Sequence, residues 1–102
     1  MNVVGLSPSE LLARMADVKA LTILDVRSSW EFVRGHVPGA IHVPFWRVPA
    51  HDAGAHPVVV YCGLGPRAWY AAALLRRRGV PNVSCLDGHI SRWRREGRPE
   101  ER

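Results

Sequence analysis

Short apolar runs alternate with segments of helical periodicity along this chain. The clearest run is Val58 to Tyr61, and residues 23–26, 41–43 and 83–86 form similar pieces. Each piece is too short for a buried helix, and none alternates apolar and polar residues as a strand with one solvent-exposed face does. Continuous apolar strands of this kind are typical of a parallel sheet that is covered on both faces.

Helices are expected between these strands. Ser7 can cap a helix that starts at Pro8, with Glu10 completing a capping box. Ser28 or Ser29 can cap a short helix that ends at Gly35. Further helical segments are expected near 45–48, over 67–78 and over 89–96, followed by a frayed polar tail over 97–102. The alternation predicts an α/β fold, with a small parallel-stranded central sheet covered by helices on both faces.

Length and composition fit one compact domain over residues 1–102, with its core at about 6–99. The chain has 102 residues, of which 47% are hydrophobic. No apolar run approaches the ~18 residues of a membrane span, and the first residues lack the pattern of a secretory signal. We therefore expect a cytoplasmic monomer with no membrane partner.

The net charge of +5 is carried almost entirely by arginine. Arg76, Arg77 and Arg78 fall in the last turn of the expected helix, where cations complement the helix dipole. No aromatic stacking platform or nucleic-acid motif accompanies the arginines. We expect anionic small molecules as partners, and no nucleic acid. The role of the arginine-rich C-terminal helix is not indicated by the sequence.

The segment Cys62-Gly63-Leu64-Gly65-Pro66-Arg67 carries the candidate chemistry. It follows the end of a buried strand and leads into a helix, where both a thiolate and a bound anion are stabilised. Gly63 and Gly65 can turn consecutive amides inward as an anion-binding nest. Because Pro66 has no N–H, the candidate donors are Gly63, Leu64, Gly65, Arg67 and Ala68. Arg67 adds a guanidinium fork that matches an oxyanion.

These features predict a cysteine nucleophile, Cys62, that is activated by the local field, because the loop contains no histidine or acid. A buried core cysteine beside a glycine turn is the alternative for Cys62. Cys85 lies within an apolar run and is interpreted as a small core residue. A disulfide between the two cysteines is not expected, and neither they nor His51, His56 and His89 have metal-ligand spacing.

The chain resembles the rhodanese family of sulfurtransferases from about Leu6 to Pro99. The resemblance rests on three segments in order: Asp25-Val26-Arg27 with Trp30-Glu31-Phe32 and the stretch 35–44, then Tyr61-Cys62 through Arg67, then Leu86-Asp87-Gly88 with Trp93 and 97–99. Ala68 departs from the family pattern, which often has a hydroxyl residue there. Asp87-Gly88-His89 replaces the commoner glycine pair, and the loop has no second cation beside Arg67.

The resemblance implies a two-step transfer without cofactor or metal. Cys62 would take the sulfane sulfur from a donor such as thiosulfate or a persulfide, and the resulting Cys62 persulfide would pass it to cyanide or a thiol. The acceptor could be a thioredoxin-like protein. Two other functions stay open: a binding or regulatory module without turnover, and a cysteine phosphatase of the related fold, whose loop needs one more residue between cysteine and arginine.

Some residues outside the loop are also assigned roles. Asp25 is expected to support the site structurally, through neighbouring backbone or an arginine, without touching substrate. Arg27 and Glu31 are expected to form a local ion pair. Trp30, Trp46, Trp69 and Trp93 are most simply core or half-buried, with Trp46 a candidate for the mouth of the site.

Overall fold

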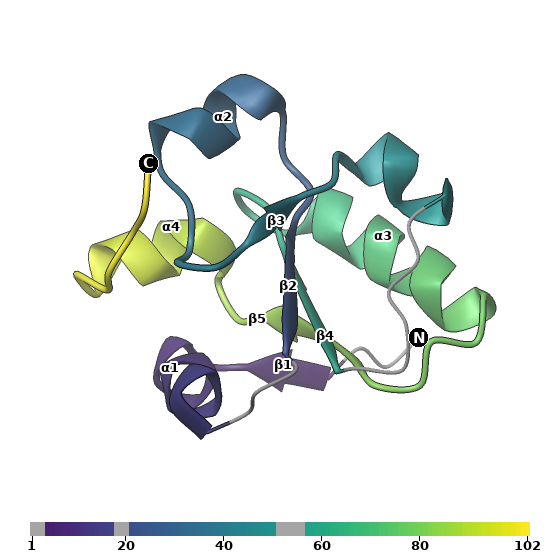
Figure 1. Ribbon diagram of the computed structural model, residues 1–102, viewed down its shortest axis with the longest axis horizontal. Helices are drawn as coiled ribbons and strands as arrows, with labels where there is room; N and C mark the ends of the chain where they lie inside the picture. The colour runs from purple at the N-terminus through teal and green to yellow at the C-terminus, as the bar shows by residue number, and fades with distance from the viewer. Residues whose placement is uncertain (1–3, 18–20, 51–56) are drawn as a thin grey trace.

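The computed structural model describes residues 4–17, 21–50 and 57–102, and it places a five-stranded sheet at the centre (Figure 1). The order of the strands is β1-β5-β4-β2-β3, and all their pairings are parallel. The strands are β1 (Val4–Leu6), β2 (Thr22–Asp25), β3 (Ile41–His42), β4 (Val58–Tyr61) and β5 (Val83–Leu86). The helices are α1 (Pro8–Asp17), α2 (Ser29–Arg34), α3 (Pro66–Arg77) and α4 (His89–Arg95), with a 3₁₀ helix η1 (Phe45–Ala50).

The sheet separates two hydrophobic clusters, which confirms the predicted layers. On one face α3 and η1 pack against β2, β4 and β5 through Ala71, Ala72, Leu75 and Val48. On the other face α1 and α4 contribute Leu11, Ile90 and Trp93. Figure 1 shows α1 and α4 on one side of the strands and α3 on the other. Since β4 is buried along its whole length, its four residues are all apolar or aromatic.

The helix starts follow the capping signals in the sequence. In α1, the Ser7 amide donates to Glu10 Oε1 at 3.0 Å, and the Glu10 amide donates to Ser7 Oγ at 3.1 Å. In α2, Ser28 and Glu31 form the equivalent capping box, and Gly35 ends the helix. These local bonds satisfy amides that have no partner inside the helix.

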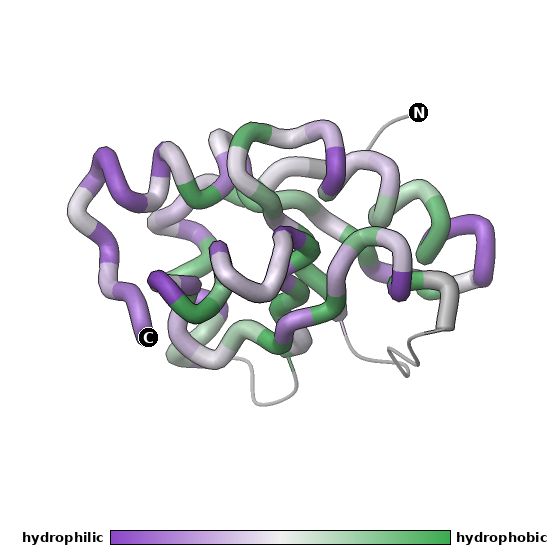
Figure 2. Tube along the Cα trace, turned by 90° about the horizontal axis from the view of Figure 1, so that it is seen from above, coloured by the Kyte–Doolittle hydropathy of each residue, from purple (hydrophilic) through white to green (hydrophobic). Residues whose placement is uncertain are grey.

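Two features differ from the sequence-based expectation. The strand β1, which pairs with β5 at the sheet edge, was not predicted. The tail after Gly97 is tied down instead of frayed, since His36 and Glu101 form an antiparallel bridge with N···O distances of 2.9 and 2.8 Å. Figure 2 shows this hydrophilic end of the chain beside the more hydrophobic interior.

The parallel arrangement fixes the position of the candidate site. Because β2, β4 and β5 run in the same direction, their carboxyl ends meet at one edge of the sheet. Asp25 ends β2, Cys62 follows β4, and the turn at Asp87 follows β5. Ligand sites in open α/β sheets lie at such an edge.

Candidate active site

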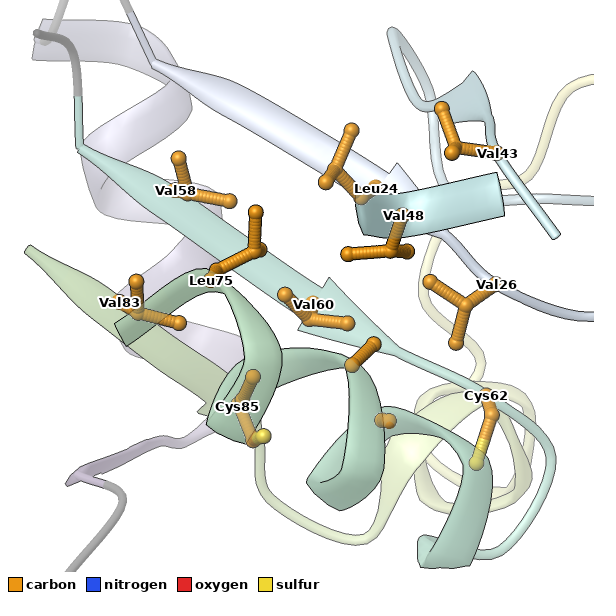
Figure 3. Packing of buried hydrophobic residues seen from close by; sticks show 13 residues of the cluster. Leu24, Val26, Val43, Val48, Val58, Val60, Cys62, Leu75, Val83 and Cys85 are labelled. Atoms are coloured by element: carbon orange, nitrogen blue, oxygen red, sulfur yellow. The ribbon is translucent and has the colours of Figure 1, made fainter. Parts of the chain in front are cut away.

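Cys62 lies between the end of β4 and the start of α3, and its side chain is fully buried. The Gly65 amide donates a hydrogen bond to Cys62 Sγ at 3.0 Å. Figure 3 shows the sulfur beside the first turn of α3, at the end of the apolar cluster. In this structure the Cys62 side chain is removed from solvent.

The two loop glycines differ in conformation. Gly65 has φ +143°, and a Cβ there would come within 2.9 Å of the Trp69 ring, so both the backbone angle and the close ring require glycine. Gly63 is not among the positive-φ glycines, and a Cβ there would lie 3.3 Å from Arg67 Nη2. Gly63 therefore leaves room for the Arg67 side chain to lie over the loop. Of the two loop glycines, Gly65 is therefore the one whose positive φ requires glycine.

The other predicted substrate-binding residues occupy different surroundings. Leu64 is 79% exposed at the loop tip, whereas Ala68 is fully buried in α3 against the sheet. The amides of Gly63, Leu64, Arg67 and Ala68 remain predicted donors for a bound substrate. In the described structure, the Gly65 amide donates to the sulfur at 3.0 Å, and the Arg67 side chain also interacts with Cys62.

Arg67 forms an ion pair with Glu31 of α2. Its Nη1 donates to Glu31 Oε1 at 2.8 Å and its Nη2 to Glu31 Oε2 at 3.2 Å. This two-point bond from Arg67 lowers the pKa of Glu31 to about 2, and the same bond raises the pKa of Arg67. The predicted pair between Arg27 and Glu31 is therefore wrong, because each residue has a closer partner of opposite charge in the fold.

The partner of Arg27 is Asp25, at the end of β2. Arg27 Nη2 lies 2.7 Å from Asp25 Oδ2, and both side chains are buried. The Tyr61 hydroxyl donates to the same Oδ2 at 2.8 Å and accepts the Val37 amide at 3.0 Å. Burial raises the pKa of Tyr61, and the charge of Asp25 adds to this. The arginine partner expected for Asp25 is thus present, and the network supports the strand ends beneath the loop.

Burial alone would lower the pKa of Arg27, but its hydrogen bonds and charge interaction with Asp25 outweigh this and raise it. Arg27 Nη2 also donates to the Gly35 carbonyl at 2.8 Å. Both members of the buried pair therefore have further partners, as a buried ion pair requires.

The start of α4 holds the first residues of the loop, a role that sequence reasoning missed. The Cys62 amide donates to His89 Nδ1 at 3.2 Å, and the Ile90 amide donates to the Cys62 carbonyl at 3.1 Å. Ser91 Oγ donates to the Gly63 carbonyl at 3.0 Å. The signal for this role was the histidine that replaces a glycine of the family pattern.

Exposed aromatic side chains occur on several elements near this edge, contrary to the expected packing of the tryptophans. Trp93 is fully buried, but Trp30, Trp46 and Trp69 are 60%, 61% and 56% exposed. Trp46 lines a cavity of about 740 Å³. The other lining residues are Ser28, Ser29, His42, Val43, Pro44 and Arg47.

Cys85 is a free thiol in the same core cluster as Cys62, as expected for a small core residue. Burial raises the pKa of Cys85 to about 12.

Within the described ranges, no group of three or more histidine, cysteine or acidic residues could hold a metal ion. His51 and His56, which were assigned no ligand role, lie outside those ranges. None of the described helices is both long and apolar enough to cross a bilayer.

Comparisons with known proteins agree on one family. A sulfurtransferase from Allochromatium vinosum is 33% identical over 87% of this chain and 86% of its own length. The thiosulfate sulfurtransferase GlpE of Stutzerimonas stutzeri is 34% identical over 85% of this chain and 82% of its own. Both relatives therefore match this chain over most of their length.

Solved structures agree as well. The Alr3790 protein from Anabaena has a TM-score of 0.86 and 29% identity over 94% of this chain and 81% of its own. A thiosulfate sulfurtransferase from Pseudomonas aeruginosa has a TM-score of 0.88 and 25% identity over 97% of this chain, which matches 20% of that larger protein. The family model of the rhodanese-like domain matches residues 7–96. The chain therefore belongs to the rhodanese-like domain family.

Proposed function

We propose that this protein is a sulfurtransferase that carries sulfane sulfur on Cys62. The observation that carries the proposal is the hydrogen bond from the Gly65 amide to Cys62 Sγ, at the end of β4 and the entrance to α3. A donor aimed at the sulfur stabilises negative charge on it, both as a thiolate and as a persulfide. The names of the relatives support the same chemistry.

The proposed reaction has two steps. The Cys62 thiolate attacks the outer sulfur of thiosulfate; a new S–S bond forms, the sulfur–sulfur bond of the donor breaks, and sulfite leaves with its electron pair. Cyanide or an acceptor thiolate then attacks the outer sulfur of the Cys62 persulfide. Thiocyanate or an acceptor persulfide is released, and the Cys62 thiolate is regenerated. A persulfide donor would react in the same way and release its thiolate.

The remaining parts of the proposal concern the substrates and the setting. The donor is a small anion, which Arg67 and the predicted loop amides would hold. The acceptor is cyanide or a thiol, including a thiol of a thioredoxin-like protein. We propose that the protein works as a cytoplasmic monomer. Because Cys62 is buried and Arg67 is paired with Glu31, the donor must displace part of the loop cover before attack.

The test compares the two cysteines. Incubation of the reduced protein with thiosulfate and cyanide is expected to give thiocyanate, and mass spectrometry is expected to show one added sulfur on Cys62. C62S should lose both signals, while C85A, the matched control, should keep both. A folded wild-type protein that transfers no sulfur from thiosulfate or glutathione persulfide would contradict the proposal.

A binding module without turnover is the second candidate, and the complete burial of Cys62 favours it. Its signature would be a Cys62 that never becomes persulfidated although the fold is intact. The phosphatase alternative has less support, because the loop is one residue short of the length that a phosphoryl group requires. Hydrolysis of an aryl phosphate that disappears in C62S would favour it.

A further inference from the structure

His89 occupies a position where a ring nitrogen replaces a backbone carbonyl. The register between β4 and β5 ends with the pair Val60 and Cys85, and the chain leaves β5 after Leu86. Cys62 follows β4, and its amide has no strand carbonyl of β5 beside it. It donates to the His89 ring nitrogen Nδ1 at 3.2 Å. This bond therefore fixes the backbone of Cys62 just beyond the end of the β4–β5 pairing.

The conformation of His89 is unusual and well enclosed. Its φ is +53°, the one positive value of a non-glycine residue in the described ranges. Histidine is among the residues that tolerate this left-handed region, but the conformation still stores strain. The side chain is buried, and its ring meets the Trp69 ring edge-to-face with centroids 6.2 Å apart. The fold thus holds the imidazole in place from two sides.

The hydrogen bond defines the protonation state of the ring. An imidazole nitrogen accepts a hydrogen bond only when it carries no proton, so the neutral His89 ring has its proton on Nε2. If Nδ1 were protonated, its N–H would face the N–H of Cys62, and the hydrogen bond between them would be lost. The hold on Cys62 therefore exists only in the neutral ring.

Charged or titratable side chains occur on the elements that pack against this ring. Asp87 precedes it in the turn from β5, the Arg92 side chain of α4 lies against Gly88, and Arg67 and Cys62 belong to the loop and the start of α3. Burial lowers the pKa of His89, while the negative charge of Asp87 acts in the opposite direction. The neutral form therefore prevails near pH 7, and acidification is needed to protonate the ring.

Resting on the proposed sulfurtransferase function, we propose that His89 is a positioning residue for Cys62. The neutral imidazole fixes the Cys62 amide, and with it the direction of Sγ toward the Gly65 amide; protonation of the ring releases this hold and slows sulfur uptake. His89 acts through the backbone of Cys62 and touches no substrate.

The test uses two substitutions: one keeps a hydrogen-bond acceptor for the Cys62 amide but cannot be protonated, and the other removes the acceptor. H89N keeps an acceptor oxygen in the place of Nδ1, tolerates positive φ and cannot be protonated in this range. H89G removes the acceptor and relieves the backbone strain. H36N is the matched control, because His36 is a half-buried histidine whose ring is also bonded through Nδ1, to the Phe32 carbonyl. Thermal unfolding of each variant shows that it is folded.

The expected rates differ in a way that a purely structural role would not produce. At pH 7.5, H89N should retain a kcat close to wild type, and H89G should lose about tenfold to a hundredfold in kcat, as for other misplaced reacting groups. Between pH 7.5 and 5 the ratio of the wild-type to the H89N rate should fall, while the ratio of wild type to H36N stays constant. These ratios cancel any pH dependence that all the variants share.

A wild-type rate in H89G, or a ratio to H89N that stays constant or rises on acidification, would overturn the inference. Two measurements remain informative if the protein transfers no sulfur: the alkylation rate of Cys62 by iodoacetamide across the same pH range, and the ¹⁵N shift of the His89 ring and Cys62 amide. A His89 Nδ1 that carries a proton at pH 7.5 would also overturn it. Failure of sulfur transfer with these signatures present would count against the proposed function alone.

Discussion

Glu31 and Arg67 are 36 positions apart in sequence, yet both oxygens of the Glu31 carboxylate accept hydrogen bonds from the Arg67 guanidinium. The pair joins α2 to the start of α3 across the mouth of the cysteine loop. It also neutralises Arg67, the one cation of the loop. In the proposed reaction, an anionic donor would therefore compete with an internal carboxylate for Arg67.

Replacement of Glu31 by glutamine should make Arg67 more available. The glutamine preserves the capping box with Ser28 but removes the negative charge. We expect the KM for thiosulfate in E31Q to fall about twofold to fivefold, which is the scale of a partly exposed ion pair. Steady-state kinetics at low ionic strength measure this. E96Q, which alters the Glu96 pairs with Arg92 and Arg98, is the control, and an unchanged or higher KM in E31Q would contradict the argument.

The same ion pair predicts an acid dependence of stability. The pKa of Glu31 falls from 4.5 to about 2 on folding, so the folded state binds a proton less readily than the unfolded state. Its contribution is fully present above pH 4.5 and is lost as the pH falls from 4.5 toward 2. Urea unfolding at pH 6, 4 and 3 should show a smaller loss of stability in E31Q than in wild type. Equal losses in the two proteins would refute this.

The hydroxyl of Tyr61 should contribute to stability out of proportion to its size. Y61F leaves the Val37 amide without its acceptor and removes one donor from Asp25, both in the buried interior. We expect a loss of about 1–3 kcal/mol in the free energy of unfolding. Y70F is the control, since the Tyr70 side chain is 55% exposed and its change should stay within about 0.5 kcal/mol. A loss in Y61F no larger than in Y70F would remove the argument.

The C-terminal tail should stabilise the domain although it is polar. Truncation after Arg98 removes the Pro99 carbonyl that accepts Trp93 Nε1 and the Glu101 backbone that pairs with His36. We expect the free energy of unfolding to fall by about 1–3 kcal/mol, because a buried donor loses its partner. Deletion of Arg102 alone is the control. Identical denaturation curves for the truncated and full-length proteins would show that the tail is dispensable.

The elements with strong local signals were predictable from the sequence. The apolar runs gave β4 and β5, and the capping residues Ser7 and Ser28 gave the starts of α1 and α2. The three-residue strand β1 was not predictable, because it is too short for periodicity and is identified by its pairing with β5. Local patterns predicted these elements, whereas β1 is defined by its pairing with β5 in the folded chain.

In the candidate site, too, the local motif was predictable and its long-range partners were not. The loop from Cys62 to Arg67 was visible as a motif, but the partner of Arg67 was not, because Glu31 is close to it only in the folded chain. Sequence proximity suggested Arg27 for Glu31, and the fold instead gives Arg27 to Asp25. The contact of His89 with the Cys62 amide likewise depends on how α4 packs beneath the loop.

The direction of the strands also bears on how the molecule can be handled at the bench. Thr22, Val58 and Val83 begin their strands at the edge opposite Cys62, and the exposed residues Pro81 and Asn82 lie at the same edge. A fluorophore or surface tether attached through the side chain at position 82 would therefore lie on the far side of the sheet from the Cys62 loop. Immobilisation by that route would leave the loop edge of the sheet facing the solution.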